Sequence, residues 1–136
     1  MDYSLINITT EQTIPIRHQA MWPDKPVDFV RIPNDNEGQH FGIEMNNELV
    51  AIISLFVKNG EAQFRKFATV KKHQGKGIGS YLLNEIIERA QHKNLQRIWC
   101  NARVDKADFY HRFGLETTTQ TYTKGGIDFV VMERWF

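Results

Sequence analysis

Residues 74–79 (QGKGIG) constrain the fold more than any other segment, because three glycines in five residues separate two different apolar patterns. Residues 62–70 alternate as a strand does, and the apolar residues from 78 to 90 recur at helical spacing. Glycine adopts positive φ, so successive backbone N–H groups can turn toward one centre. The helix adds unpaired N–H groups and the positive end of its dipole. A strand, a turn and a helix that bind a phosphate are therefore predicted.

Basic side chains surround this loop, namely Lys71, Lys72, His73 and Lys76. A plain structural turn with solvated charges is the alternative interpretation, but these cations coincide with the predicted anion site. Two common nucleotide motifs do not fit. The Gly-Lys-Ser/Thr of the Walker pattern is absent, and the dinucleotide fingerprint needs a glycine where Ser80 stands.

Composition narrows the class of protein. A chain of 136 residues is expected to form a single domain, residues 1–136, around one core. The net charge of +1 argues against a dedicated nucleic-acid binder. One cysteine, Cys100, excludes an internal disulfide, and its apolar surroundings favour a buried strand residue over a catalytic thiol.

No membrane, targeting or metal signal is evident. The chain lacks an apolar stretch of about 20 residues and a leader-like N-terminus, so a soluble cytoplasmic protein is expected. The five histidines show no metal-ligand spacing, so no metal is expected.

The rest of the sequence predicts an α+β fold with a mixed, mostly antiparallel central sheet. A parallel strand pair should flank the helix that follows the glycines. Pro15 should lie near the first turn of its helix, and Asp105 should cap the short helix. The expected elements are strands at 3–8, 40–45, 48–57, 62–70, 95–100, 115–123 and 127–135, and helices from Thr9 or Thr10 toward Met21, at about 77–93 and at 105–113.

Two motifs identify a family. Gln74, Gly77 and Gly79 match the pattern Arg/Gln-x-x-Gly-x-Gly/Ala that follows an apolar strand. Residues 107–115 (ADFYHRFGL) resemble Ala-x-x-Phe-Tyr-x-x-x-Gly-Phe, with one residue instead of two between Ala107 and Phe109 and with Leu115 at the last position. On these residues, and on the order of its elements, the chain resembles the GNAT superfamily of N-acetyltransferases.

This resemblance implies the acyl-CoA N-acyltransferase fold and an enzyme that moves an acetyl group from acetyl-CoA to a primary amine by direct attack. The strand after the helix must then splay away from the strand before the loop, so that the pantetheine arm can pair with the exposed backbone. The implied cofactor-binding residues are Gln74, Gly75, Lys76, Gly77, Ile78, Gly79 and Ser80 at the pyrophosphate, and Phe67, Ala68, Thr69 and Asn101 along the pantetheine.

Tyr110 is the implied general acid, because a phenol with a pKa near about 10 is protonated at neutral pH and could protonate the departing thiolate. Phe109 and Phe113 are expected only to pack the short helix. The general base stays open, with four weak candidates in the meander: His40, Glu44, Glu48 and Glu61.

Several alternatives stay open at this point. A non-catalytic acyl-CoA-binding sensor or regulatory module would keep the loop and lose the chemistry, and a nucleotide-binding enzyme is a third reading. The acceptor amine is not fixed. The wall of the acceptor site is expected to come from residues 14–39 and the final hairpin. Within residues 14–39, four acidic residues form a solvated acidic loop or attract a cationic amine, namely Asp24, Asp28, Asp35 and Glu37. The apolar end at Trp135 and Phe136 would suit a homodimer contact.

Overall fold

A computed structural model describes residues 3–136, in which seven strands form one sheet with the order β1-β2-β3-β4-β5-β7-β6. All neighbouring strands are antiparallel except the parallel pair β4–β5, which confirms the predicted mixed sheet. The strands are β1 (Tyr3–Ile8), β2 (Gln39–Met45), β3 (Glu48–Lys58), β4 (Glu61–Thr69), β5 (Arg97–Arg103), β6 (Glu116–Lys124) and β7 (Ile127–Trp135).

Three α-helices and four short 3₁₀ turns complete the described chain. The irregular segment between α1 and β2 contains two of these turns, so it is more ordered than a plain loop. The helices are α1 (Thr10–Met21), α2 (Ile78–His92) and α3 (Ala107–His111), and the turns are η1 (Val27–Val30), η2 (Asp35–Glu37), η3 (Lys71–His73) and η4 (Val104–Lys106). No helix within residues 3–136 is long and apolar enough to cross a membrane.

Two helix predictions need correction. Pro15 is the sixth residue of α1 rather than part of its first turn, and the helix is held instead by a capping box between Thr9 and Gln12. Asp105 does not cap α3. Its place is inside η4, and Lys106 precedes α3 without a side-chain cap, because the chain enters the helix through a 3₁₀ turn.

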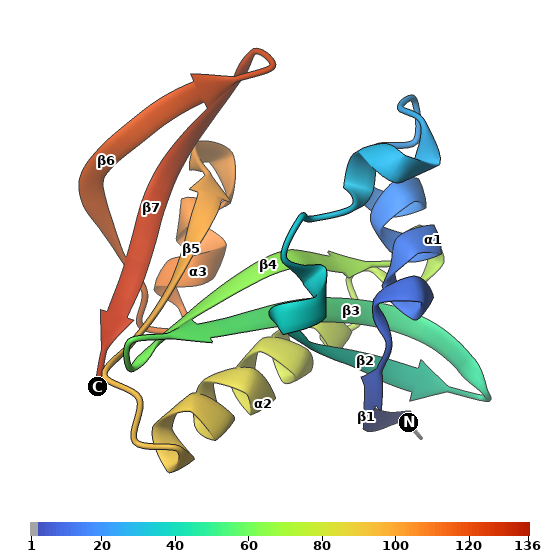
Figure 1. Ribbon diagram of the computed structural model, residues 1–136, viewed down its shortest axis with the longest axis horizontal. Coiled ribbons are helices and arrows are strands. Elements are labelled where there is room, and N and C mark those ends of the chain that lie inside the picture. Colours follow the sequence, from blue (N-terminus) through green and yellow to red (C-terminus); the bar gives the residue numbers. More distant parts are fainter. Residues whose placement is uncertain (1–2) are drawn as a thin grey trace.

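The sheet splits at its single parallel pair. β4 and β5 pair only through Glu61–Arg97, Ala62–Ile98 and Gln63–Trp99, and beyond these residues the strands diverge. Figure 1 shows β4 (light green) and β5 (orange) starting close together and then running in different directions. The splay that the family resemblance requires is therefore present at fold level.

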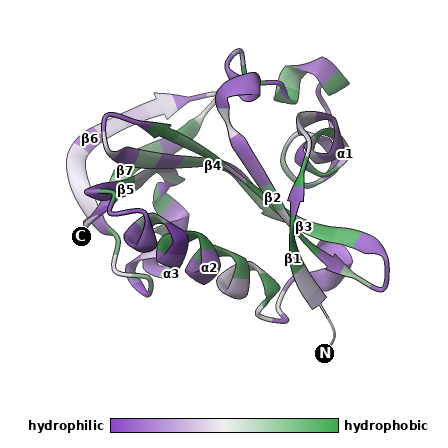
Figure 2. Cartoon of the chain, turned by 60° about the horizontal axis from the view of Figure 1, so that its bottom comes forward, coloured by the Kyte–Doolittle hydropathy of each residue, from purple (hydrophilic) through white to green (hydrophobic). Residues whose placement is uncertain are grey.

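The helices cover opposite faces of the sheet. α2 buries Ile78, Leu82, Leu83 and Ile86 in the main core beneath the central strands. α1 packs on the other face, where Ile16 joins Ile8 and Ile52 in a second cluster. In Figure 2 the apolar green colour concentrates in the central strands, whereas β6 is mostly pale. The gap between β4 and β5 therefore lies in a sheet whose two faces are covered by α2 and by α1.

Candidate active site

The splay between β4 and β5 contains a cavity of about 740 Å³. It extends from the segment between β4 and α2 to the end of α1, and it is bounded by β4, β5, α3 and β7. Eleven of the twelve residues that the sequence singled out for chemistry or cofactor binding line this cavity. Lys76 is the exception, and its ammonium instead lies 3.4 Å from Nδ1 of His73.

The glycine loop, residues 74–80, turns its backbone toward open space. Gly75 and Gly77 have φ values of +78° and +80°, which other residues adopt only with strain. A Cβ atom added at either position would meet nothing within 4 Å. Within residues 3–136 no protein acceptor takes the N–H groups of Gly75, Lys76 or Gly77. Together with the first turn of α2, these groups can bind an anion.

The end of β4 fixes the position of this loop. The Gln74 side chain donates from Nε2 to the Thr69 carbonyl over 3.0 Å. At Gly79 an added Cβ would lie 3.3 Å from Thr69 Oγ1 and 3.4 Å from the Phe67 ring. Glycine at position 79 therefore allows the first turn of α2 to pack directly against the strand, and a larger residue would have to displace the Thr69 or Phe67 side chain.

A β-bulge interrupts β4 in the middle of the cavity wall. Ser54 faces Arg65 and Ile52 faces Ala68, so two residues, Lys66 and Phe67, stand against one residue of β3. Lys66 has a φ of +54°, which is unusual for a residue with a side chain. The bulge removes regular pairing from β4 where it lines the cavity, and it turns Lys66 into the cavity wall.

Tyr110 lies on α3 and borders the cavity. Its ring centroid is 5.8 Å from that of Phe64 and 5.2 Å from that of Phe109. Burial raises the pKa of the Tyr110 phenol well above its ordinary value, so the hydroxyl keeps its proton throughout the physiological pH range. Phe109 does more than pack the short helix, because its ring also lines the cavity.

Cys100 is the first residue of β5 beyond the three that pair with β4. Its side chain is buried and borders the cavity. Burial raises the pKa of the thiol to about 12, so the reactive thiolate is disfavoured. The prediction of a buried strand residue is confirmed. Asn101, the next residue, is exposed and lines the cavity from β5.

The four candidate bases do not reach the cavity. His40 is buried and bonds Ser54 over 2.7 Å, Glu48 pairs with Lys72 over 3.1 Å, and Glu61 pairs with Arg97 over 3.0 Å. Glu44, the fourth, is half-buried on β2, which does not contribute to the cavity. The meander therefore supplies no group positioned to take a proton from the acceptor.

Three of the four acidic residues, Asp24, Asp28 and Glu37, are exposed as a solvated loop predicts, and none of the four lines the cavity. Asp35 departs from the prediction. Asp35 is only 7% exposed and forms a buried ion pair with Arg17. Asp28 bonds Arg31 over 3.0 Å and lies outside the cavity, as Asp24 does. Glu37 borders a separate hollow, beside Trp99 and Phe56.

The positive charge of the cavity was not predicted from the sequence. Five cationic side chains line it, and within the described chain no Asp or Glu does. Arg65 could have been noticed, because it lies on the strand predicted at 62–70 to border the cofactor. Arg103 lies beyond the strand predicted at 95–100, because β5 extends to Arg103. Lys66 could not have been noticed, because its orientation depends on the bulge. The five are Arg65, Lys66, Arg103, Lys106 and Arg112.

Comparisons with known proteins agree with this geometry. An N-acetyltransferase of Bacillus subtilis, YitI, itself uncharacterised, is 25% identical over 129 residues, covering 88% of this chain and 87% of its own. A candidate N-acetyltransferase from Lactobacillus plantarum superposes with a TM-score of 0.87 at 16% identity, covering 99% of both chains. A GNAT acetyltransferase from Elizabethkingia anophelis, solved with acetyl-CoA bound, has a TM-score of 0.77 at 18% identity, covering 98% of both.

The decisive match is to a family rather than to one protein. The sequence model described as "Acetyltransferase (GNAT) domain" matches residues 24–135, which include the glycine loop, the splayed strands and Tyr110. The structural neighbours have the same mixed sheet. The chain therefore belongs to the GNAT family of acetyltransferases, and it is an acyltransferase enzyme of the N-acetyltransferase type.

Proposed function

We propose that this chain acts as a single domain that transfers an acetyl group from acetyl-CoA to a primary amine. The observation that carries the proposal is the glycine loop, whose unpaired N–H groups face open space beside a splayed strand. A diphosphate needs such a loop, and a peptide-like arm needs an unpaired strand edge. The neighbour from Elizabethkingia anophelis, solved with acetyl-CoA bound, supports the choice of ligand.

Each part of the cavity then has a role in holding the donor. The backbone of the glycine loop, from Gln74 to Ser80, binds the diphosphate. Phe67, Ala68 and Thr69 present backbone groups to the pantetheine amides, and Asn101 approaches from β5. The bulge at Lys66 leaves N–H groups available near the carbonyl that reacts, where a donor would stabilise developing negative charge.

Tyr110 gives its proton to the sulfur of coenzyme A as the carbon–sulfur bond breaks. Because burial raises the pKa of the phenol, Tyr110 is protonated when the thiolate forms. The neutral amine attacks the carbonyl directly, and its new carbon–nitrogen bond replaces the carbon–sulfur bond. The proton that the nitrogen releases passes through water to the tyrosinate, which restores Tyr110, and no covalent bond to the protein forms. Cys100 does not serve as a nucleophile, because burial raises its pKa to about 12.

The cavity also helps the amine to lose its proton. An ammonium ion beside five cationic side chains has a lowered pKa, because like charges disfavour its charged form. Neutral amine is the nucleophile, so the cationic lining increases the reactive fraction. Holding this amine next to the thioester supplies much of the remaining rate enhancement.

Calorimetric titration with acetyl-CoA, combined with a thiol-release assay over a panel of primary amines, tests the proposal. Micromolar binding and amine-dependent release of coenzyme A are the expected results. Binding without turnover of any amine, and no change on Tyr110→Phe, would support the sensor. Tighter binding of ATP or NAD than of coenzyme A would support a nucleotide-binding enzyme.

A further inference from the structure

We infer that the natural acceptor is an amine that carries a carboxylate or phosphate group, recognised by Arg65, Lys66 and Arg103. This inference rests on the proposed function, because it names the substrate class of the same site. The observation behind it is the sign of the charges: the cavity has five cations and, within residues 3–136, no carboxylate in its lining.

Arg65 and Arg103 lie on the face of the sheet that α1 covers. Ala62 and Phe64 of β4, and Cys100 and Ala102 of β5, face the α2 core. Because side chains alternate along a strand, Arg65 and Arg103 point the other way. The position of Ser54 agrees, since it pairs with Arg65 and accepts a hydrogen bond from the buried Arg17 of α1.

Lys66 belongs to the same group of cations. The bulge places it beside Arg65, and it is half-buried. Burial, together with the positive charges of Arg65, Arg17 and Lys124 and against the opposing effect of Asp35, lowers the pKa of Lys66 to about 8. A cation that is partly stripped of water in this way gains most from an anionic partner.

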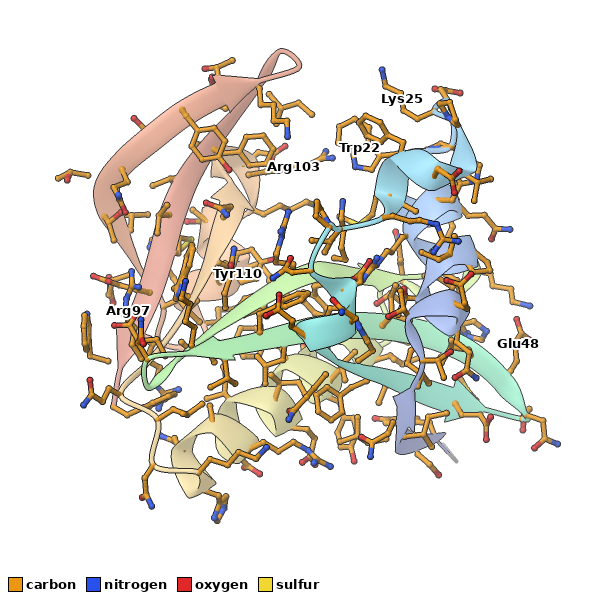
Figure 3. All side chains as sticks on the ribbon, in the orientation of Figure 1. Trp22, Lys25, Glu48, Arg97, Arg103 and Tyr110 are labelled. Atoms are coloured by element: carbon orange, nitrogen blue, oxygen red, sulfur yellow. The ribbon has the colours of Figure 1, made fainter. Side chains whose placement is uncertain are left out.

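The phosphates of the donor are bound elsewhere. The glycine loop precedes α2. Lys106 is the last residue of η4 and Arg112 directly follows α3, on the side where Phe109 packs against the main core. Arg65 and Lys66 lie on β4, which α1 contacts, and Ala20 and Met21 at the end of α1 line the same cavity. Figure 3 shows Arg103 reaching toward the space between the β6–β7 hairpin and α1, with Trp22 on the far side.

An anion on the acceptor fits this arrangement better than a second positive charge. A diamine or polyamine would bring an additional cation against three fixed ones, and like charges placed together in an interface are costly. A carboxylate or phosphate matches the planar fork of arginine. Phe129 of β7 lines the cavity and provides an apolar surface, and its ring stacks on that of Tyr122 in the same hairpin, with centroids 5.1 Å apart.

The test compares acceptors that differ only in the group distant from the amine. The carboxylate arm uses ω-amino acids of two to six carbons, their neutral amides and the corresponding diamines, and the phosphate arm pairs O-phosphoethanolamine with ethanolamine. We expect at least one anionic acceptor to exceed its neutral partner about 100-fold in kcat/KM, and the diamine by more. The better arm identifies carboxylate or phosphate as the group recognised.

Variants link this preference to the residues. Arg65→Gln and Arg103→Gln should each raise KM for the anionic acceptor about 10-fold and reduce the preference over the neutral amide. Lys93→Gln, at the end of α2 and outside the cavity, removes the same charge and should leave the preference intact. Acetyl-CoA binding is measured on every variant, so that loss of donor binding is recognised separately.

Failure of this inference is distinguishable from failure of the proposed function. No acetyl-CoA binding and no acetylation of any amine would overturn both. Binding of acetyl-CoA with equal or better turnover of neutral or cationic amines would overturn the acceptor assignment alone. If no tested amine turns over, titration of the coenzyme A complex with 5-acetamidopentanoate and its amide decides, because equal affinity would refute an anion site.

Discussion

Arg17 of α1 and Asp35 of η2 form a two-pronged ion pair in the interior, with Nη1–Oδ2 and Nη2–Oδ1 distances of 2.9 and 2.8 Å. Neither side chain is more than 9% exposed. Arg17 also donates to the Val30 carbonyl and to Ser54 Oγ, and Ser54 in turn bonds His40. This pair therefore fixes the segment between α1 and β2 against the sheet, next to the acceptor side of the cavity.

Asp35→Asn should destabilise the protein by about 3–5 kcal/mol, because it leaves the Arg17 charge buried without a counter-ion. Urea unfolding followed by circular dichroism measures the change. Asp28→Asn is the control, because Asp28 pairs with Arg31 in solvent and its loss should have little effect. Similar stability of the two variants would contradict the importance assigned to the buried pair.

The same pair should make stability sensitive to acid. Burial alone raises the pKa of Asp35, but hydrogen bonds from Arg17 and Ile32 N–H and the charge of Arg17 outweigh it, so the pKa lies below its ordinary value of 3.8. The carboxylate's contribution is complete above pH 3.8 and is lost as the pH falls through the lower folded-state pKa. Urea unfolding at pH 2.5–6 should show this loss in the wild type and a shallower decline in Asp35→Asn.

Tyr110→Phe should lower kcat by about 10²–10⁴-fold, because the departing thiolate loses its proton donor. The affinity for acetyl-CoA should change little, since the ring and its packing on Phe64 are retained. Thiol release gives kcat, and calorimetry gives the affinity. An unchanged kcat in a folded variant would assign the proton to another group.

Gly77→Ala should weaken acetyl-CoA binding about 10-fold, because alanine disfavours the φ of +80° that turns the loop N–H groups toward the cavity. Gly125→Ala provides a matched control. Gly125 also has a positive φ, +59°, and open space around it, but it lies in the β6–β7 turn. Calorimetry should separate the two variants, while thermal unfolding should show comparable losses of stability. Equal donor affinity in both would argue against the loop as the diphosphate site.

The preference for anionic acceptors should fall as the pH rises through about 8, because Lys66 loses its charge there. The groups that set this pKa are Arg65, Arg17, Lys124 and Asp35. The readout is the ratio of kcat/KM for 6-aminohexanoate to that for its amide, because amines this far from the differing group ionise almost alike and their ionisation cancels in the ratio. Lys66→Arg should keep this ratio constant up to about pH 10. A ratio independent of pH in the wild type would exclude Lys66 from acceptor recognition.

Much of the fold could be predicted from local chemistry. Asn46-Asn47, Asn59-Gly60 and Gly125-Gly126 all have the positive φ values that two-residue hairpins need, so the turns located the strands. The glycine loop could also be predicted, because its conformation depends on residue type. The predictions for Pro15 and Asp105 were wrong. Tertiary packing keeps Pro15 inside α1, beyond the usual position of proline, and a 3₁₀ turn before α3 takes the place of a cap at Asp105.

The parts of the site that consist of backbone could be predicted from the sequence. The side chains that come together only because β4 and β5 diverge could not. The loop and Tyr110 follow motifs with fixed spacing, and the structure brings both to one cavity. The shared position of Arg65, Lys66 and Arg103 depends on a bulge and on the angle between β4 and β5, which no local pattern records. The buried partner of Arg17 was hidden for the same reason, since 18 residues separate it from Asp35.

Only three residue pairs join β4 to β5, so the main-chain hydrogen bonding at this seam, the junction of the two strands, is the weakest between neighbouring strands of the sheet. Strands β1–β4 on one side and β5–β7 on the other are joined there chiefly by side chains and by α2 packed beneath. Any molecule that inserts an amide-bearing chain into the seam acts as a temporary eighth strand. Binding of the substrate would then also hold the two halves of the sheet together. Amide hydrogen exchange along the facing edges of β4 and β5 would become slower as a result.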